Sequence, residues 1–191
     1  MRKINSKGFT LIELLAVITI MGILMIVAIP AVTRTIENSR KDTFLDTVKQ
    51  YANGTKTMWA SDNLVCGTEN FPSSAVAAGT YYIEIDSART DVPQVLESGG
   101  KSPWGGRDIK GVMVIEVEDV ASTGTRKVTY TPFLSDGIHG VNLTAPASGS
   151  SNSTRISSAK EASNLKRGDL QMSKITYNTS VYAGATKCVE A

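Results

Sequence analysis

The sequence predicts an α+β protein in which one long N-terminal helix precedes an antiparallel sheet. Residues 14–33 form an apolar run without a charged side chain. Apolar positions then recur at helical spacing from Ile36 to Trp59. Beyond Cys66, short alternating segments are separated by turns rich in glycine. A long helix followed by a meander of strands is typical of the α+β class.

The first 33 residues predict a membrane-spanning helix with a basic leader. As a helix the uncharged run is roughly 30 Å long, enough to cross a bilayer core. Arg2, Lys3 and Lys7 precede it, which places the leader in the cytoplasm and the chain beyond residue 34 outside. The run is longer than the apolar core of a cleaved signal peptide, and Pro30 closes it without a small-x-small cleavage site.

Glu13 is the exception in this segment, because it lies at the edge of the apolar run. A carboxylate there costs on the order of 2–3 kcal/mol on insertion scales, so a membrane carboxylate usually has a partner and a function. An ordinary signal anchor would give the residue no such role. The sequence therefore marks Glu13 as a candidate functional residue.

The segment Gly8–Leu15, GFTLIELL, resembles the prepilin processing site of type IV pilins and pseudopilins, and Gly22 and Pro30 extend the resemblance. It implies a leader at 1–8 and a transmembrane, filament-core helix at 9–33. A prepilin peptidase would cut between Gly8 and Phe9 and methylate the new amino group of Phe9. In the filament, Glu13 would face the Phe9 ammonium of a neighbouring copy, and such a pair fixes register even where its net stabilisation is small.

Gly22 and Pro30 mark places where the apolar helix is expected to bend or melt. Proline removes a backbone donor and crowds the preceding turn. The alternative is that both residues are simply tolerated, as they are in many membrane helices.

The helix is expected to continue as an amphipathic segment over 34–61, the first part of a globular pilin head at 34–191. Its apolar positions lie on one helical face, and core packing explains them without a ligand. Gly54 weakens the helix by up to about 1 kcal/mol. The predicted face consists of Phe44, Val48, Tyr51, Ala52, Thr55 and Trp59.

The region 80–191 is expected to hold the sheet and its loops. Residues 67–79 are interpreted as a loop, and three strands are predicted at Tyr81–Asp86, Val112–Val117 and Lys127–Phe133. Residues 144–160 have a linker composition, and Leu170–Tyr182 regains β character.

The turn Ser102–Gly106, SPWGG, is similar to the Pro-Trp-Gly turn of major pseudopilins and to turns in pilin-like proteins of Gram-positive bacteria. In pseudopilins a calcium site often follows that turn. Here the candidate acids are scattered without the spacing of a calcium loop, so no metal or other cofactor is predicted and calcium stays an alternative. These acids are Asp108, Glu116, Glu118, Asp119 and Asp136.

Cys66 and Cys188 both lie on the predicted outer side of the membrane, where disulfides persist. Many pilins tie down the C-terminal region with such a bridge, and the chain-entropy model assigns a loop this long about 4–5 kcal/mol. Two buried thiols are the alternative.

No enzyme is predicted. The single histidine, His139, is interpreted as a loop residue, and neither cysteine has neighbours with metal-ligand spacing. The net charge of +2 reflects 20 Lys and Arg against 18 Asp and Glu. Without the three basic residues of the leader, 17 remain against 18, so net charge gives no support for nucleic-acid binding. The basic residues at 155–174 read as a solvated face rather than as a DNA-binding track.

The sequence thus predicts a prepilin held in the cytoplasmic membrane and assembled with copies of itself into a type IV pilus-like filament at the cell surface. The filament would serve adhesion, motility or aggregation, and its expected partners are the prepilin peptidase and the assembly machinery. A pseudopilin of a type II secretion or competence (DNA-uptake) system is the alternative within the family. A membrane-anchored extracellular enzyme or ligand-binding protein is the alternative from another class.

Overall fold

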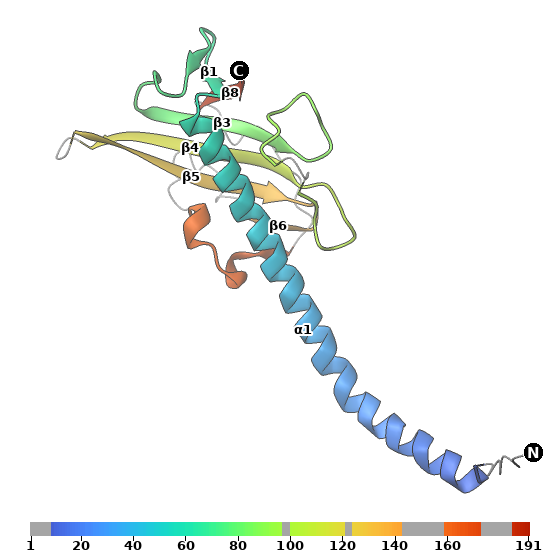
Figure 1. Ribbon diagram of the computed structural model, residues 1–191. Helices are drawn as coiled ribbons and strands as arrows, with labels where there is room; N and C mark the ends of the chain where they lie inside the picture. The colour runs from blue at the N-terminus through green and yellow to red at the C-terminus, as the bar shows by residue number, and fades with distance from the viewer. Residues whose placement is uncertain (1–8, 97–99, 121–123, 143–158, 173–184) are drawn as a thin grey trace, which may run out of the picture. The chain divides into compact units, whose positions relative to one another are not determined.

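The computed structural model describes residues 9–96, 100–120, 124–142, 159–172 and 185–191. Within these residues, one long helix, α1, precedes eight strands and two short 3-10 helices. Figure 1 shows α1 and the longer strands. The leader 1–8 and most of the linker-like stretch 144–160 lie outside these residues. The elements are α1 (Leu11–Ala60), β1 (Leu64–Cys66), β2 (Phe71–Pro72), β3 (Gly79–Asp86), β4 (Lys110–Val120), β5 (Thr125–Ser135), β6 (His139–Val141), η1 (Ala162–Asn164), η2 (Arg167–Asp169), β7 (Gln171–Met172) and β8 (Thr186–Glu190).

The chain divides into two compact units, Met1–Ser39 and Arg40–Ala191. In the first unit, α1 begins at Leu11 and is helical through Gly22 and Pro30. Threonine hydroxyls in this unit donate hydrogen bonds to carbonyls of the preceding turn. The Thr33 hydroxyl, for example, donates to the Ile29 carbonyl at 2.9 Å. The expected bend at Gly22 or Pro30 stays a prediction.

The second unit is built on a sheet with the strand order β2-β1-β8-β3-β4-β5-β6-β7. Its centre is the long antiparallel pair β4 and β5, in register from Lys110↔Ser135 to Val120↔Thr125. Every pairing is antiparallel except that of β3 with β8, which places the C-terminal strand between β1 and β3. The predicted α+β class is confirmed.

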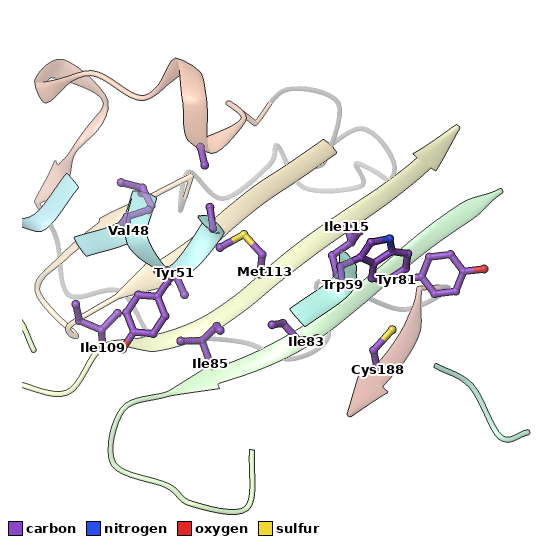
Figure 2. Packing of buried hydrophobic residues seen from close by; sticks show 14 of the residues in the cluster. Val48, Tyr51, Trp59, Tyr81, Ile83, Ile85, Ile109, Met113, Ile115 and Cys188 are labelled. Carbon is purple, nitrogen blue, oxygen red and sulfur yellow. The ribbon is translucent and has the colours of Figure 1, made fainter. Parts of the chain in front are cut away.

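The core lies between one face of the sheet and the part of α1 from Arg40 onward. All six helix positions predicted to face the core are buried, and Leu45 joins them. The strands contribute alternate side chains, so that Tyr81, Ile83 and Ile85 of β3 are buried. Figure 2 shows Val48, Tyr51 and Trp59 of the helix beside the inward residues of β3 and β4. The amphipathic interpretation is therefore confirmed.

Four short strands were not predicted, and two expectations are wrong. The predicted loop 67–79 contains β2, and His139 opens β6 instead of lying in a loop. β1, β2 and β6 are two or three residues long and carry no periodic pattern of their own. β8 forms because β1 and β3 flank it. Within the predicted β segment Leu170–Tyr182, the structure describes the short strand β7. The rest of that segment belongs to residues 173–184, which lie outside the described part.

Gly54 has a packing role that helix propensity alone does not reveal. A Cβ atom at this position would lie 2.4 Å from the backbone oxygen of Val95 and 2.6 Å from its Cγ1 atom. The loop after β3 thus approaches the helix backbone directly. Farther along this loop, the Tyr51 hydroxyl donates to the Gly100 carbonyl at 3.1 Å. Glycine in the helix permits that close approach.

Candidate functional site

The first described residues form a complete capping box at the start of α1. Thr10 is the N-cap residue, and its hydroxyl accepts a bond from the Glu13 N–H at 3.4 Å. The Glu13 carboxylate reaches back and accepts from the N–H and the hydroxyl of Thr10, each at 2.8 Å through Oε2. Phe9 and Thr10 are not helical. The helix therefore begins two residues after Phe9, while Gly8 lies outside the described residues.

Glu13 thus has a local partner within its own chain. The Thr10 bonds engage Oε2, and they orient the carboxylate toward the N-terminal end of the helix, where the partial positive charge of the helix dipole lies. The side chain is held beside the residue that follows Phe9. The carboxylate is accordingly close in sequence and in space to the position at which cleavage after Gly8 would create an ammonium group.

The apolar part of α1 is long and apolar enough to cross a membrane. Its most apolar window has a mean hydropathy of 2.8, and none of that window is buried within the chain. Large side chains such as Ile23, Ile26 and Val27 are 67–76% exposed. Exposure of a continuous apolar helix to water is unfavourable, so this surface must be covered by lipid or by other helices.

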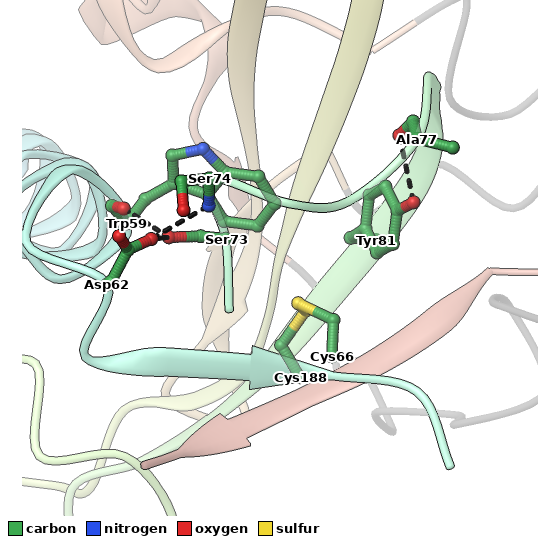
Figure 3. The surroundings of a disulfide bond; sticks show 8 residues. All are labelled: Trp59, Asp62, Cys66, Ser73, Ser74, Ala77, Tyr81 and Cys188. Atoms are coloured by element: carbon green, nitrogen blue, oxygen red, sulfur yellow. Dashed lines mark hydrogen bonds between the residues drawn. A yellow bond between two sulfur atoms is a disulfide. The ribbon is translucent and has the colours of Figure 1, made fainter. Parts of the chain in front are cut away.

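Cys66 and Cys188 form a disulfide that joins the ends of the head. The two residues are directly paired in β1 and β8, with Cα atoms 4.0 Å apart, and both side chains are buried. Figure 3 shows the bond between the two strands. It connects the segment that directly follows α1 with the C-terminal strand across 122 residues of sequence. No free cysteine remains.

A buried polar cluster, formed by Ser102, Asp136 and His139, occupies the other end of the sheet. The Ser102 hydroxyl donates to Asp136 Oδ2 at 2.5 Å, and Nδ1 of His139 lies 3.2 Å from the same oxygen. The N–H groups of Ile138 and His139 donate to Oδ1 at 2.9 and 2.7 Å. Trp104 covers the cluster, with its ring stacked on that of His139 at 3.7 Å.

The order in which the three side chains contact one another indicates a structural role for this cluster. In a serine hydrolase the histidine lies between the serine and the carboxylate, so that it can take the serine proton. Here the carboxylate lies between the serine and the histidine. Burial opposes ionisation of Asp136, but its hydrogen bonds from Ser102, His139 and Ile138 outweigh burial and hold its pKa below the ordinary value. Sequence reasoning missed this site because Ser102 comes from a turn 34 residues earlier.

The acids considered for calcium are dispersed over the head. Asp108 accepts from Ser87 at 3.1 Å and pairs with Lys101, while Asp119 bonds Arg126. Glu118 lies 3.8 Å from Lys127. Burial, reinforced by Glu118 and Glu161, raises the pKa of Glu116. Among the residues that the structure describes, no group of three or more His, Cys, Asp or Glu side chains is placed to hold a metal ion.

The described part of the head has at least two hollows on its surface. One of about 390 Å³ lies between α1, β5 and η1, and includes Lys49, Tyr130 and Glu161 in its lining. Burial raises the pKa of Tyr130 to about 12, so its hydroxyl stays protonated at neutral pH. The second, of about 400 Å³, lies on the outer side of β1 and β8 and includes Val65 and Val189.

Comparison with known proteins identifies the N-terminal segment. Residues 3–29 match the family model of the prokaryotic N-terminal methylation motif, the class III leader of type IV pilins and pseudopilins. This is a structural motif and not an enzyme class. One long apolar helix with an antiparallel-rich sheet is consistent with a type IV pilin fold. Searches of curated proteins and of solved structures found no match.

Proposed function

We propose that the chain is a prepilin, a structural subunit of a type IV pilus-like filament that serves adhesion, motility or aggregation. The observation that carries the proposal is the methylation motif over residues 3–29, which includes Gly8, Phe9 and Glu13. The motif supports a pilin or pseudopilin in general, and the pilus role is the more specific part of the proposal.

Processing comes first in this proposal. A prepilin peptidase hydrolyses the bond between Gly8 and Phe9 on the cytoplasmic side and methylates the amino group of Phe9. The non-helical backbone at Phe9 and Thr10 supports this assignment, because the scissile bond then lies before the first helical turn. Removal of the leader also removes Arg2, Lys3 and Lys7, the charges that retain the N-terminus in the cytoplasm.

Assembly then exchanges one environment of α1 for another. The exposed apolar segment is covered by lipid before assembly and by the helices of other subunits afterwards. Glu13 of one subunit pairs with the Phe9 ammonium of its neighbour. In a low-dielectric core an unpaired carboxylate is costly, so subunits in the wrong register are disfavoured. The pair thereby contributes specificity more than stability.

The head belongs outside the cytoplasm in this proposal. The basic leader favours that orientation, and the Cys66–Cys188 disulfide suits an oxidising compartment. Before assembly the chain resides in the cytoplasmic membrane, and after assembly it resides in a surface filament.

The test compares two variants that each remove one carboxylate from α1. Cells expressing the wild-type chain are sheared, and the filament fraction is probed for this protein. Glu13→Ala is expected to abolish recovery in that fraction, while the protein remains folded in the membrane. Asp46→Ala, at an exposed position of the head, serves as the control and should assemble normally.

The outcomes separate the candidate functions. Long filaments with Glu13→Ala would contradict the proposal. A wild-type chain that is processed but found only in short, envelope-bound assemblies would favour a pseudopilin, to which the Pro-Trp-Gly turn at 103–105 also points. A wild-type chain that keeps its leader and stays monomeric would favour the membrane-anchored enzyme or ligand-binding protein.

A further inference from the structure

We propose that the hollow between α1, β5 and η1 binds a small zwitterion that carries two carboxylates and one ammonium group. This is the charge pattern of an acidic amino acid, and also of a dipeptide that contains one. The inference goes beyond the filament function and does not depend on it, because every residue that lines the hollow belongs to the unit from Arg40 onward.

The helix wall of the hollow is basic. Lys49, Asn53 and Lys56 follow one another at intervals of four and three residues, so they lie along one stripe of α1. Lys49 is half-buried, while Asn53 and Lys56 are exposed. Among the described residues, the two lysine ammonium groups have no ion-pair partner and the Asn53 amide has no hydrogen-bond partner. This wall therefore offers two uncompensated positive charges and an amide to a ligand.

The opposite wall carries one negative charge. The half-buried Glu161 directly precedes η1, and the Ser163 hydroxyl lies 3.5 Å from its Oε2 atom. Within the described part of the chain, no cationic side chain lies at ion-pair distance from Glu161. Burial raises the pKa of Glu116, and the charges of Glu118 and Glu161 raise it further. An ammonium group bound beside Glu161 would compensate this negative charge.

Tyr130 of β5 lies between the two walls. It packs against the main core and also lines the hollow. A buried tyrosine hydroxyl usually has a hydrogen-bond partner, but among the described residues the half-buried Tyr130 hydroxyl has none. Because burial raises the pKa of Tyr130 to about 12, the hydroxyl keeps its proton at neutral pH and can donate to a carboxylate. Ala52 and Val128 provide apolar contacts for the methylene groups of a ligand.

Charge and size together select the ligand class. Lys49, Lys56 and Glu161 are the charged residues of the lining, so its net charge is +1. A ligand with two carboxylates and one ammonium group carries −1 and can place each charge at the wall of opposite sign. A dicarboxylate without the ammonium group would leave Glu161 uncompensated, and a neutral amino acid would leave one lysine uncompensated. The volume of about 390 Å³ lies in the lower part of the range of small-molecule sites.

The affinity should be modest. The hollow lies at the surface, where solvent screens each charge pair, so that one pair is worth up to about 1 kcal/mol, or about fivefold in affinity. We therefore expect dissociation constants in the millimolar range and a preference that depends on the pattern of charges.

An NMR titration of the full chain in detergent, with isotope-labelled tyrosine, tests the site. L-glutamate and the dipeptide Ala-Glu are the probes, and Tyr130→Phe identifies the Tyr130 resonance. We expect that resonance to shift with either probe at millimolar concentration. Glutarate, which lacks the ammonium group, and L-glutamine, which lacks one carboxylate, should bind about fivefold more weakly than L-glutamate. Tighter binding of Ala-Glu than of L-glutamate would assign the site to peptides, and the reverse order would assign it to the free amino acid.

Two charge-removing variants test the walls separately. Lys49→Gln and Glu161→Gln should each weaken L-glutamate binding about fivefold. Only Glu161→Gln should leave glutarate binding undiminished, because it removes a repulsion. Lys41→Gln changes a lysine of α1 outside the hollow and is the matched control, which should bind like the wild type. Thermal unfolding at the wild-type temperature shows that each variant is folded.

Three results would overturn the proposal. One is that neither probe shifts the Tyr130 resonance at millimolar concentration. Another is that glutarate binds the wild type as tightly as L-glutamate does. The third is that Lys41→Gln weakens binding as much as Lys49→Gln. None of these measurements involves filament assembly, so failure of the ligand site leaves the proposed function untouched.

Discussion

The ring of Trp104 lies stacked on the imidazole of His139, with centroids 3.7 Å apart and planes 12° from parallel. The same indole packs against Phe44 of α1 at 5.9 Å. Trp104 therefore connects three parts of the head: the helix, the turn before β4 and the start of β6. Its position explains why a turn and a short strand, neither of which has a strong local pattern, are held in place.

Trp104→Ala should be among the most destabilising single substitutions in the head. Removing a nearly buried indole leaves a cavity and costs about 3–5 kcal/mol. Trp104→Phe retains part of the packing and should lose less. Scanning calorimetry of the full chain in detergent measures both. Equal transition temperatures for Trp104→Ala and the wild type would show that the indole does not connect these elements.

The stability of the head should depend on pH through Asp136. Its folded-state pKa is lowered, so its stabilising contribution is present above the unfolded value of about 4 and is lost as pH falls through the folded value. Asp136→Asn should therefore be less stable than the wild type at pH 5–7, and the difference should shrink below about pH 4. Ser102, Arg107 and His139 are the polar and charged side chains facing this carboxylate.

Unfolding temperatures of the wild type and of Asp136→Asn across this pH range test whether their stability difference shrinks as the pH falls. Asp46→Asn, at an exposed position, is the control and should match the wild type throughout. A difference between Asp136→Asn and the wild type that grows as pH falls below 4 would contradict the lowered pKa.

Loss of the disulfide should destabilise the head to the same extent whichever cysteine is removed. The chain-entropy model gives about 4–5 kcal/mol for a loop of this length. Cys66→Ala, Cys188→Ala and the double variant should unfold at similar denaturant concentrations, because the first substitution already opens the bridge. Additive losses in the double variant would instead indicate two independent buried thiols.

Gly54→Ala should destabilise the protein although alanine is the better helix former. Helix propensity favours alanine by about 1 kcal/mol. The new methyl group, however, would lie 2.4 Å from the Val95 backbone oxygen, so the loop must move. Overpacking of this kind typically costs about 1–3 kcal/mol. Gly22→Ala, where a Cβ meets nothing within 4 Å, is the matched control. A Gly54→Ala protein more stable than the wild type would show that the loop yields easily.

The elements predicted from sequence are those with a strong local pattern. The helical face from Phe44 to Trp59 and the cores of β3, β4 and β5 follow periodicities that burial imposes on one chain segment. β1 and β8 depend on partners distant in sequence, as Cys66 and Cys188 illustrate. β2 and β6 pair with neighbouring strands, but they are only two and three residues long. Their short sequences contain little of the information that forms them.

The candidate functional residues also separate into those with a local sequence pattern and those that come together only in the fold. The assignments of Phe9 and Glu13 depend on a contiguous motif, so sequence was sufficient to propose them. The Ser102–Asp136–His139 cluster is assembled from a turn and a hairpin that meet only in the folded head. Asp136 and His139 are three residues apart, a spacing compatible with a local turn, but nothing in that spacing indicates Ser102 as the third member.

The N-terminus of the chain recovered from sheared filaments tests the central claim most directly. Mass spectrometry of the mature protein should find that residues 1–8 are absent and that Phe9 carries one additional methyl group on its α-nitrogen. A chain that begins at Met1, or one that begins beyond Pro30, would contradict processing at Gly8 and with it the assignment as a prepilin.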